Sequence, residues 1–508
     1  MNFLPLALRL SDYCFRLPGL MLLATVVAVG CRTTAESSPP AERPNVLILF
    51  TDDQRYTAVG AQGIEEVATP ATDGLMAEGT SFTNSYILGA PHGAVCSPSR
   101  AMLMTGRHYF NLELGVYAAF AVADSLRGES RYLTFPEYFK ANGYRTFATG
   151  KQHNGRQWIE RGFEEGRALF LGGMTTHFGT RVADFAPGSG WSEPYADEDK
   201  FSSEVFADAA VDFLQRDTSD DAPFLMYVAF TAPHDPRTAP EAYHDSYPAA
   251  ETELPVNFLE GHPFPIADMK IRDEKLAAFP RRREEVQQHL ADYYAMITAT
   301  DAQIQRVLDA LEASGQADNT IVVFSSDNGL AVGQHGLLGK QSVYEHSVKV
   351  PLVFRGPGIP ENHRVDALAY LHDVFPTLCE LIGLPVPESV QTESLAPVLK
   401  QQEAEVRESM HYGYNAGPND QRIDQRGAHR AVRQGDYKLI VSSKDGVVTH
   451  QLFNLAEDPW EMDDLSGNAE LEQKKAELLA ELKSLIEQTG DPAELDQDMF
   501  GLFATANQ

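Results

Sequence analysis

The sequence contains little cysteine and little positive charge for its length. Only 4 of 508 residues are cysteine, and Lys and Arg number 41 against 72 Asp and Glu, a formal net charge of −31. Only Cys96 and Cys379 lie beyond the first 31 residues, so a disulfide framework is excluded. Nucleic acid is excluded as the expected partner because its binding depends on a basic surface. An anionic substrate would need a pocket that is locally positive.

The apolar run near the N-terminus, LPGLMLLATVVAVG (17–30), is too short to cross a membrane. Arg9 and Arg16 precede it, as in an export signal, and it ends in AVGC, which resembles a bacterial lipobox. We therefore interpret residues 1–30 as a signal peptide of the lipoprotein type and 31–43 as a flexible tether. The protein is expected in the periplasm or at the cell surface, anchored by a lipid at Cys31 or, alternatively, secreted without one.

Four short apolar runs each end at polar residues. Runs rich in Val, Ile, Leu and Phe are typical of strands that are buried on both faces of a parallel sheet. Amphipathic stretches such as 289–315 lie between them, and this alternation predicts an α/β fold: a large mixed, mostly parallel sheet sandwiched by helices. The four runs are NVLILF (45–50), YRTFATG (144–150), PFLMYVAF (223–230) and TIVVFSS (320–326).

The residues that follow these runs indicate a chemical site, because open α/β sheets bind ligands beyond the carboxyl ends of their strands. One Asp or Asn after a strand is usually a turn former or a helix cap, but four such strand ends together need another explanation. Carboxylate and amide oxygens suit Ca²⁺ or Mg²⁺ better than zinc, so we predict a divalent cation of either kind. The candidates are Asp52, Asp53, Lys151, His153, His234, Asp327 and Asn328.

The scarce Cys96 opens the stretch CSPSRAMLMTGR (96–107), whose proline and arginine predict a turn into a helix N-terminus, where anions are attracted. This stretch resembles the signature of the type I, formylglycine-dependent sulfatases of the alkaline phosphatase superfamily, Cys-x-Pro-x-Arg followed by Thr-Gly-Arg. The similarity continues to LFNLAEDPWEMDDLS (452–466). The resemblance implies that Cys96 is the precursor of formylglycine (3-oxoalanine) and that a formylglycine-generating enzyme is its maturation partner.

The resemblance also implies an activity, the hydrolysis of sulfuric esters, and a metal site. Arg100 would orient the formylglycine hydrate that serves as the nucleophile. The cation would be Ca²⁺, with Mg²⁺ as the alternative, and it would polarise the sulfate group. Its implied ligands are Asp52, Asp53, Asp327, Asn328 and an oxygen of modified Cys96.

Two lysines and two histidines complete the implied machinery. Lys151 and Lys340 would bind the sulfate oxygens as charge builds on them. His234, helped by Lys340, would protonate the departing alcohol, and His153 would take a proton from the hydrate. The lysine motif departs from the family pattern because Gln152 replaces the usual aromatic residue, while the spacing of Lys151 and His153 is kept.

The substrate is expected to be a sulfated oligo- or polysaccharide, algal or glycosaminoglycan. APHDPR (232–237) and GQHGLLGK (333–340) resemble the sugar-directed, iduronate-2-sulfatase-like branch of the family. His335 would reach the leaving-group side of the pocket, unless it is only a surface loop residue. Arg237 would pair with a substrate carboxylate, unless it forms a structural ion pair. The segment 156–200 is predicted to form long loops over the site.

The composition changes near residue 400. Alternating apolar residues and a Lys-Asp-Gly turn signal predict antiparallel strands, and LEQKKAELLAELKSLIEQTG (471–490) predicts a closing helix. We therefore predict a catalytic domain over 44–400 and a C-terminal subdomain over 401–508.

Two other functions compete with the sulfatase hypothesis. Phosphonate monoester or phosphodiester hydrolases of the same superfamily can share the Cys-x-Pro-x-Arg motif, because phosphoryl and sulfuryl groups need similar binding groups. A surface lipoprotein that binds sulfated glycans without turnover is a different class. Cys96 would then remain a thiol.

Overall fold

The computed structural model describes residues 43–113, 131–216, 222–264, 269–416, 427–444 and 446–495, all within a compact unit that begins at Arg43. The predicted signal peptide, Cys31 and nearly all of the tether lie outside the described residues, so these interpretations stay predictions. Within the described ranges, no helix combines the length and the apolar character that crossing a membrane requires.

The four predicted strands are consecutive neighbours in a ten-stranded sheet, sheet A, and all four are parallel. The predicted mixed, mostly parallel sheet is therefore confirmed. The strand order is β11-β2-β10-β9-β1-β8-β4-β5-β6-β7. The bounds are β1 Asn45–Thr51, β2 Thr80–Tyr86, β4 Arg145–Lys151, β5 Glu165–Phe170, β6 Ala183–Ala186, β7 Gly190–Trp191, β8 Phe224–Ala229, β9 Thr320–Ser326, β10 Leu352–Arg355 and β11 His363–Tyr370.

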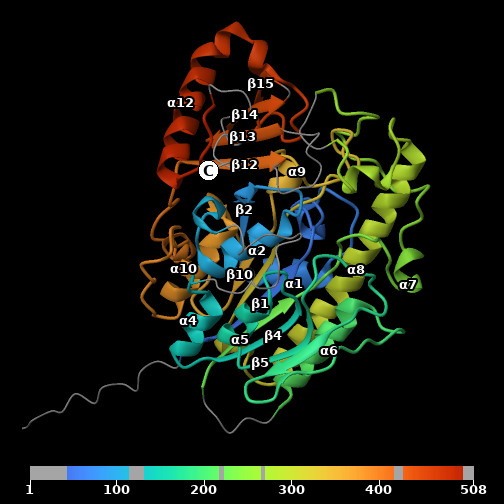
Figure 1. Ribbon diagram of the computed structural model, residues 1–508, viewed down its shortest axis with the longest axis vertical. Helices are drawn as coiled ribbons and strands as arrows, with labels where there is room; N and C mark the ends of the chain where they lie inside the picture. The colour runs from blue at the N-terminus through green and yellow to red at the C-terminus, as the bar shows by residue number, and fades with distance from the viewer. Residues whose placement is uncertain are drawn as a thin grey trace, which may run out of the picture. The chain divides into compact units, whose positions relative to one another are not determined.

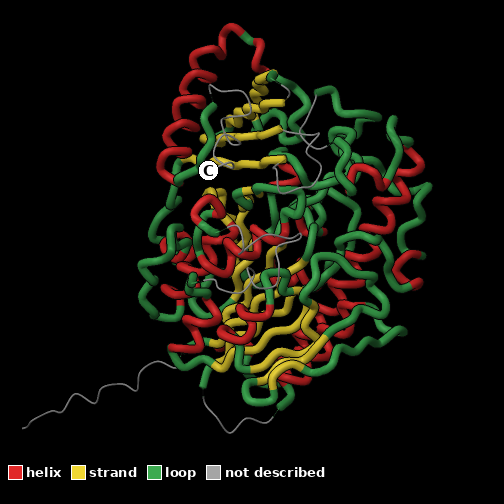
Figure 2. Tube along the Cα trace, in the orientation of Figure 1, coloured by secondary structure: helices red, strands yellow, loops and turns green. Residues whose placement is uncertain are grey.

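Helices cover both faces of sheet A, which explains why central strands such as β1 and β8 carry apolar side chains on both faces (Figures 1 and 2). In β1, Val46, Ile48 and Phe50 belong to the core on one face, while Leu47 and Leu49 belong to the core on the other. The first face packs against α2 Cys96–Thr105, α4 Phe135–Ala141, α5 Arg156–Gly162 and α10 Val374–Leu381, and the second against α1 Pro70–Ala77, α6 Ser202–Leu214 and α8 Arg283–Ala313.

A second sheet, sheet B, has the antiparallel strands that the sequence predicts near the C-terminus. The predicted closing helix, α12 Glu472–Thr489, packs on it through Leu478, Leu482 and Ile486 (Figure 1). The two-residue strand β3 Gly89–Ala90, just upstream of Cys96, pairs with its edge. The boundary predicted at residue 400 stays a prediction. The other strands are β12 Ser409–Ala416, β13 Gly427–Gln434, β14 Tyr437–Lys444 and β15 Val447–Asn454, and the short helices elsewhere are α7 Glu241–His244, α9 Glu345–Val348 and α11 Ala396–Leu399.

The segment 156–200 differs from its prediction as long loops. It begins with α5 and then supplies β5, β6 and β7, which extend sheet A beyond β4. The predicted loop character is wrong for those parts, because strands this short carry too little periodicity to be recognised. Its remaining loop, around Gly173 and Met174, does reach the site described below.

Candidate active site

Sheet A brings the predicted polar residues to one edge. Asp52 and Asp53 follow β1, Lys151 ends β4, His234 follows β8, and Asp327 follows β9. Because β9, β1, β8 and β4 are parallel neighbours, their carboxyl ends lie side by side. The side chains of Asp52 and Lys151 are almost completely buried.

The acidic group at this edge fits a divalent cation. Asp52, Asp53 and Asp327 are each at most 1% exposed, and each offers one carboxylate oxygen within 4.8 Å of the others. Asn328 donates its side-chain N–H to Asp53 Oδ1 over 2.7 Å. Among the described residues, neither Asp52 Oδ1 nor Asn328 Oδ1 has a hydrogen-bond partner although both are buried. Buried oxygens without partners beside three carboxylates are suitable ligands for a hard cation.

The pKa of Asp327 reflects the repulsion within this group. Burial raises it, and the neighbouring Asp52 carboxylate raises it further, to about 6 despite Arg100. For Asp52, burial also acts to raise the pKa, but the charge of Lys151 and other cations outweighs burial and lowers it below its usual value. A bound divalent cation would relieve the remaining repulsion between the carboxylates.

Three basic side chains face the three carboxylates. Lys151 Nζ lies 2.5 Å from Asp52 Oδ2, and Lys340 Nζ lies 2.5 Å from Asp53 Oδ1. Arg100 Nε lies 2.8 Å from Asp327 Oδ2. These three positive charges balance those of the three carboxylates. A bound divalent cation would therefore make the site locally positive, as an anionic substrate requires on a strongly acidic protein.

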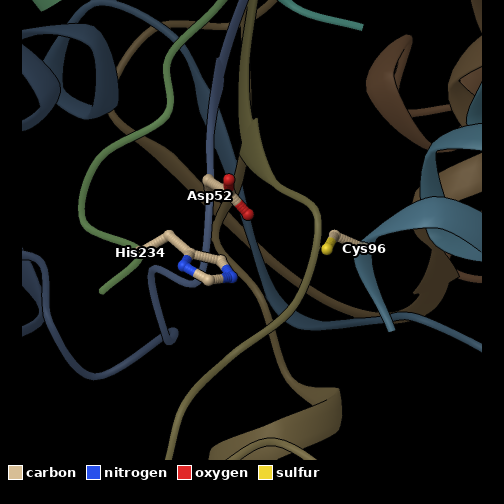
Figure 3. A group of neighbouring side chains, drawn as sticks. All are labelled: Asp52, Cys96 and His234. Carbon is tan, nitrogen blue, oxygen red and sulfur yellow. The ribbon is translucent and has the colours of Figure 1, made fainter. Parts of the chain in front are cut away.

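Cys96 is the first residue of α2, as its sequence context predicts, and it is 2% exposed. Its Sγ lies 3.8 Å from Lys340 Nζ. Together with Asp52 and His234 it forms a group whose potential ligand atoms lie within 4.8 Å of one another (Figure 3). Burial raises the pKa of the Cys96 thiol. The encoded side chain is therefore a neutral thiol, which is a weak nucleophile.

The two predicted histidines differ in how they are held. His234 Nδ1 lies 2.8 Å from the Asp235 carbonyl oxygen, and Nε2 lies 3.7 Å from Asp53 Oδ2. His153 has a left-handed backbone with φ of 59°, and its ring lies close to Gly173. Burial, together with the charge of Lys151, lowers the pKa of His153 well below its usual value. His153 is therefore neutral, and its buried Nδ1 has no hydrogen-bond partner among the described residues.

A cavity of about 240 Å³ opens onto Cys96, His153, His234 and Lys340. Gly93, Ala94, Gly173 and Met174 also line it, and the last two belong to the segment 156–200 that was predicted to lie over the site. Sequence reasoning missed the three residues that complete the wall, Ile271, Arg272 and Asp273. Arg272 binds Asp235 with both terminal nitrogens and also contacts Asp273. The segment 269–276 shows no strand-end motif, so no local signal could have assigned it to the site.

The two predicted substrate-binding residues lie elsewhere. Arg237 donates to the His289 ring over 3.0 Å and does not line the cavity. His335 stacks on Tyr344 with ring centroids 4.4 Å apart, and its Nε2 contacts the Asn257 amide at 3.1 Å. Their assignment to substrate binding stays a prediction.

The chain matches the sulfatase family over residues 44–384 and the C-terminal region of N-sulphoglucosamine sulphohydrolase over residues 333–488. An ulvan-active sulfatase of Formosa agariphila is 30% identical, with 90% of this chain and 84% of that protein covered. An N-acetylglucosamine-6-O-sulfatase of Bacteroides thetaiotaomicron is 27% identical, with 95% and 93% covered.

Solved structures share the fold. That of BT4656 in complex with its substrate D-glucosamine-2-N,6-O-disulfate has a TM-score of 0.70 and 24% identity, covering 90% of this chain and all of the other. The phosphonate monoester hydrolase of Agrobacterium radiobacter has a TM-score of 0.68 and 22% identity, covering 88% and 96%. Fold, site and family match define a hydrolase of the alkaline phosphatase superfamily. Within it, this chain belongs to the sulfatase family and is a sulfuric ester hydrolase.

Proposed function

We propose that the protein removes sulfate from a sulfated carbohydrate, using Cys96 in its formylglycine form and a bound Ca²⁺. The observation that carries the proposal is one cluster of Cys96, three carboxylates, two lysines and two histidines, of which Cys96, Lys340 and both histidines line the cavity. The similarity to sulfatases named for ulvan and for N-acetylglucosamine-6-sulfate supports a saccharide substrate.

When present, formylglycine supplies a hydrated aldehyde as nucleophile and the cation supplies positive charge at the sulfate. Residues of the chain would bind the sulfate, orient the nucleophile and transfer protons. The ammonium groups of Lys151 and Lys340 lie at the carboxylates that would bind the cation. A sulfate bound to that cation would lie beside both lysines, which would hold its oxygens. Arg100 is fixed by Asp327 and by the Lys151 carbonyl oxygen at 3.0 Å, and orients the residue at position 96. Such fixed charges stabilise a transition state without reorganising.

Proton transfer is assigned to the two histidines. His234 lines the cavity, and its Nδ1 is held by the Asp235 carbonyl oxygen, so a proton carried on Nε2 can pass to the departing sugar oxygen, which leaves as a hydroxyl. His153 lines the same cavity and is neutral, so it is suited to take a proton from the nucleophile.

The test is the release of inorganic sulfate from a panel of algal and glycosaminoglycan oligosaccharides. The protein is produced with a formylglycine-generating enzyme and calcium, and formylglycine content is measured by mass. We expect release from one saccharide class and none from Cys96→Ala. Full modification without release from any member would contradict the proposal.

Phosphonate hydrolysis is the second candidate, favoured by the shared fold of the phosphonate monoester hydrolase. Turnover of an aryl sulfate and of the matching aryl phosphonate separates the two. A clear preference for the phosphonate would overturn the proposal that the substrate is a sulfate ester. A glycan-binding lipoprotein without turnover would retain an unmodified Cys96 in its native host while still binding glycan.

The export route completes the proposal. The N-terminal pattern supports cleavage before Cys31 and lipid attachment there, which would place the enzyme in the periplasm or at the cell surface. Mass analysis of the mature N-terminus in the native host tests this. A mature chain without an acyl group on Cys31 would leave secretion as the alternative.

A further inference from the structure

Lys340 lies in a segment without helix or strand, so its backbone must be held by other means. The segment runs from the end of β9 at Ser326 to the start of α9 at Glu345. Lys340 nevertheless has to keep its ammonium group 2.5 Å from Asp53 and 3.8 Å from Cys96. A shift of about 1 Å at such a group can cost on the order of 100-fold in rate.

Two side chains bind the backbone here. Glu274 accepts the N–H groups of Leu338, at 3.1 Å, and of Gly339, at 2.8 Å. The Gln341 side-chain oxygen accepts the Lys340 N–H at 3.0 Å. Three consecutive N–H groups that end at Lys340 are therefore bound by side-chain oxygens.

Gln341 also reaches the segment that leads to Cys96. Its side-chain nitrogen donates to the Gly93 carbonyl oxygen at 2.9 Å and to Asp273 Oδ2 at 2.7 Å. Asp273 in turn contacts Arg272 on the cavity wall. One glutamine thus joins the approach to Cys96, the backbone of Lys340 and the cavity wall.

Glu274 is itself fixed in place. It is 4% exposed and forms an ion pair with Arg281, which is 1% exposed. Arg281 also donates to the carbonyl oxygens of Gly336, at 3.1 Å, and of Glu274, at 2.9 Å. A buried pair with this many hydrogen bonds is rigid.

Gly339 gives independent support. A Cβ at this position would lie 2.3 Å from the Gln341 side-chain oxygen, 3.0 Å from Asp273 Cβ and 3.1 Å from Glu274 Oε1. Only glycine lets these three side chains converge on the backbone next to Lys340.

We propose that Glu274 and Gln341 are positioning residues that fix Lys340 relative to Cys96, acting through its backbone. Neither residue lines the cavity. This inference rests on the proposed role of Lys340 at the sulfate. It predicts that substitutions of Glu274 lower catalysis only as long as Lys340 is present.

The test is a double-mutant cycle with Glu274→Gln and Lys340→Ala, measured as kcat and KM per formylglycine-containing molecule. Glu274→Gln preserves shape but leaves only one accepting oxygen, so its amide N–H₂ must face either the two backbone N–H groups or Arg281. We expect kcat to fall about 10- to 100-fold in the otherwise native enzyme. In the Lys340→Ala background, the same substitution should change kcat less than about 2-fold.

The matched control is Asp373→Asn. Asp373 is also buried, pairs with Arg407 at 2.6 Å and accepts the Tyr370 N–H at 2.7 Å, but it lies in a different segment. It should lower stability and leave kcat unchanged in both backgrounds. If Glu274→Gln fails to fold, Gln341→Met serves the same cycle.

The outcomes separate the two proposals. Equal losses from Glu274→Gln in both backgrounds, or no loss in either, would overturn the positioning role. Full activity of Lys340→Ala would instead overturn the proposed role of Lys340. A loss confined to the Lys340-containing enzyme supports both.

Discussion

Two arginines, Arg100 and Arg430, are both 0% exposed, yet they are bound in different ways. Arg430 donates from Nε and Nη2 to the two oxygens of Asp491, at 2.5 and 2.8 Å, and from Nη1 to Asn415 at 2.8 Å. Each of its three nitrogens therefore has a partner. It joins β13 to the residues that follow α12.

Arg100 is bound less completely. Its Nη2 has no hydrogen-bond partner in the part of the chain that the structure describes, and it lies 4.0 Å from Asp52 Oδ1, which has none there either. A buried polar atom without a partner costs free energy. Arg430, which is fully paired, therefore has a structural role, whereas the incomplete pairing of the equally buried Arg100 is expected at a site that binds a ligand.

Loss of the Arg430–Asp491 pair should have the greatest effect, and that effect should be on stability. Arg430→Met leaves the Asp491 carboxylate buried and unpaired, so the free energy of unfolding should fall by about 3–5 kcal/mol. Denaturant unfolding measures it. Sulfate release per folded, modified molecule should stay unchanged, and a large loss of that specific activity would break the comparison.

Arg100→Met tests the other half. Removing this fixed charge from the position 96 group should lower kcat/KM about 100- to 1000-fold. The measurement is sulfate release at matched formylglycine content, with Arg430→Met as the control. Unchanged kcat/KM would mean that Arg100 is a structural arginine like Arg430.

Metal binding should stabilise the folded protein through the carboxylates near Arg100, independently of the Arg430–Asp491 pair. At about 100 times its Kd, Ca²⁺ should raise the free energy of unfolding of chelator-treated protein by about 2.7 kcal/mol. Thermal unfolding with Ca²⁺ or Mg²⁺ measures this and ranks the two ions. Arg430→Met should keep the response and Asp327→Asn should weaken it; a chelated protein that does not respond to either ion would contradict the predicted site.

The smallest effect is an acid dependence at Asp491. Burial acts to raise the pKa of Asp491, but Arg430 outweighs burial and lowers it from 3.8 to about 2. Because the pKa of Asp491 is lower in the folded than in the unfolded protein, the ionised carboxylate stabilises the folded state above about pH 4. This contribution, about 2 kcal/mol, is lost as the pH falls toward 2. Unfolding between pH 5 and 2 should show a shallower loss for Asp491→Asn than for the native chain. Parallel curves would refute the assignment.

The centre of sheet A was predictable because its signals are local. β1, β4, β8 and β9 are buried on both faces, so each appears in the sequence as an apolar run that ends in a polar residue. Parallel pairing then places Asp52, Lys151 and Asp327 at one edge without further information.

The rest of the site depends on long-range contacts. Arg272 and Glu274 follow no strand and match no motif, and they reach the site only because the 269–276 segment folds back against Leu338 and Gly339. The position of His335 was also not predictable, because the ring that it stacks on, Tyr344, is set by the fold of the loop.

The pairing of β3 with β12 has a consequence for the order of events during synthesis. Gly89 approaches Gly413 so closely that a Cβ would lie 1.9 Å from its carbonyl oxygen, and this contact holds the chain just upstream of Cys96. Because β12 leaves the ribosome near the end of translation, the chain around Cys96 cannot be locked in place before then. The proposed modification of Cys96 would therefore have most of the translation time in which to reach a residue that the finished protein encloses.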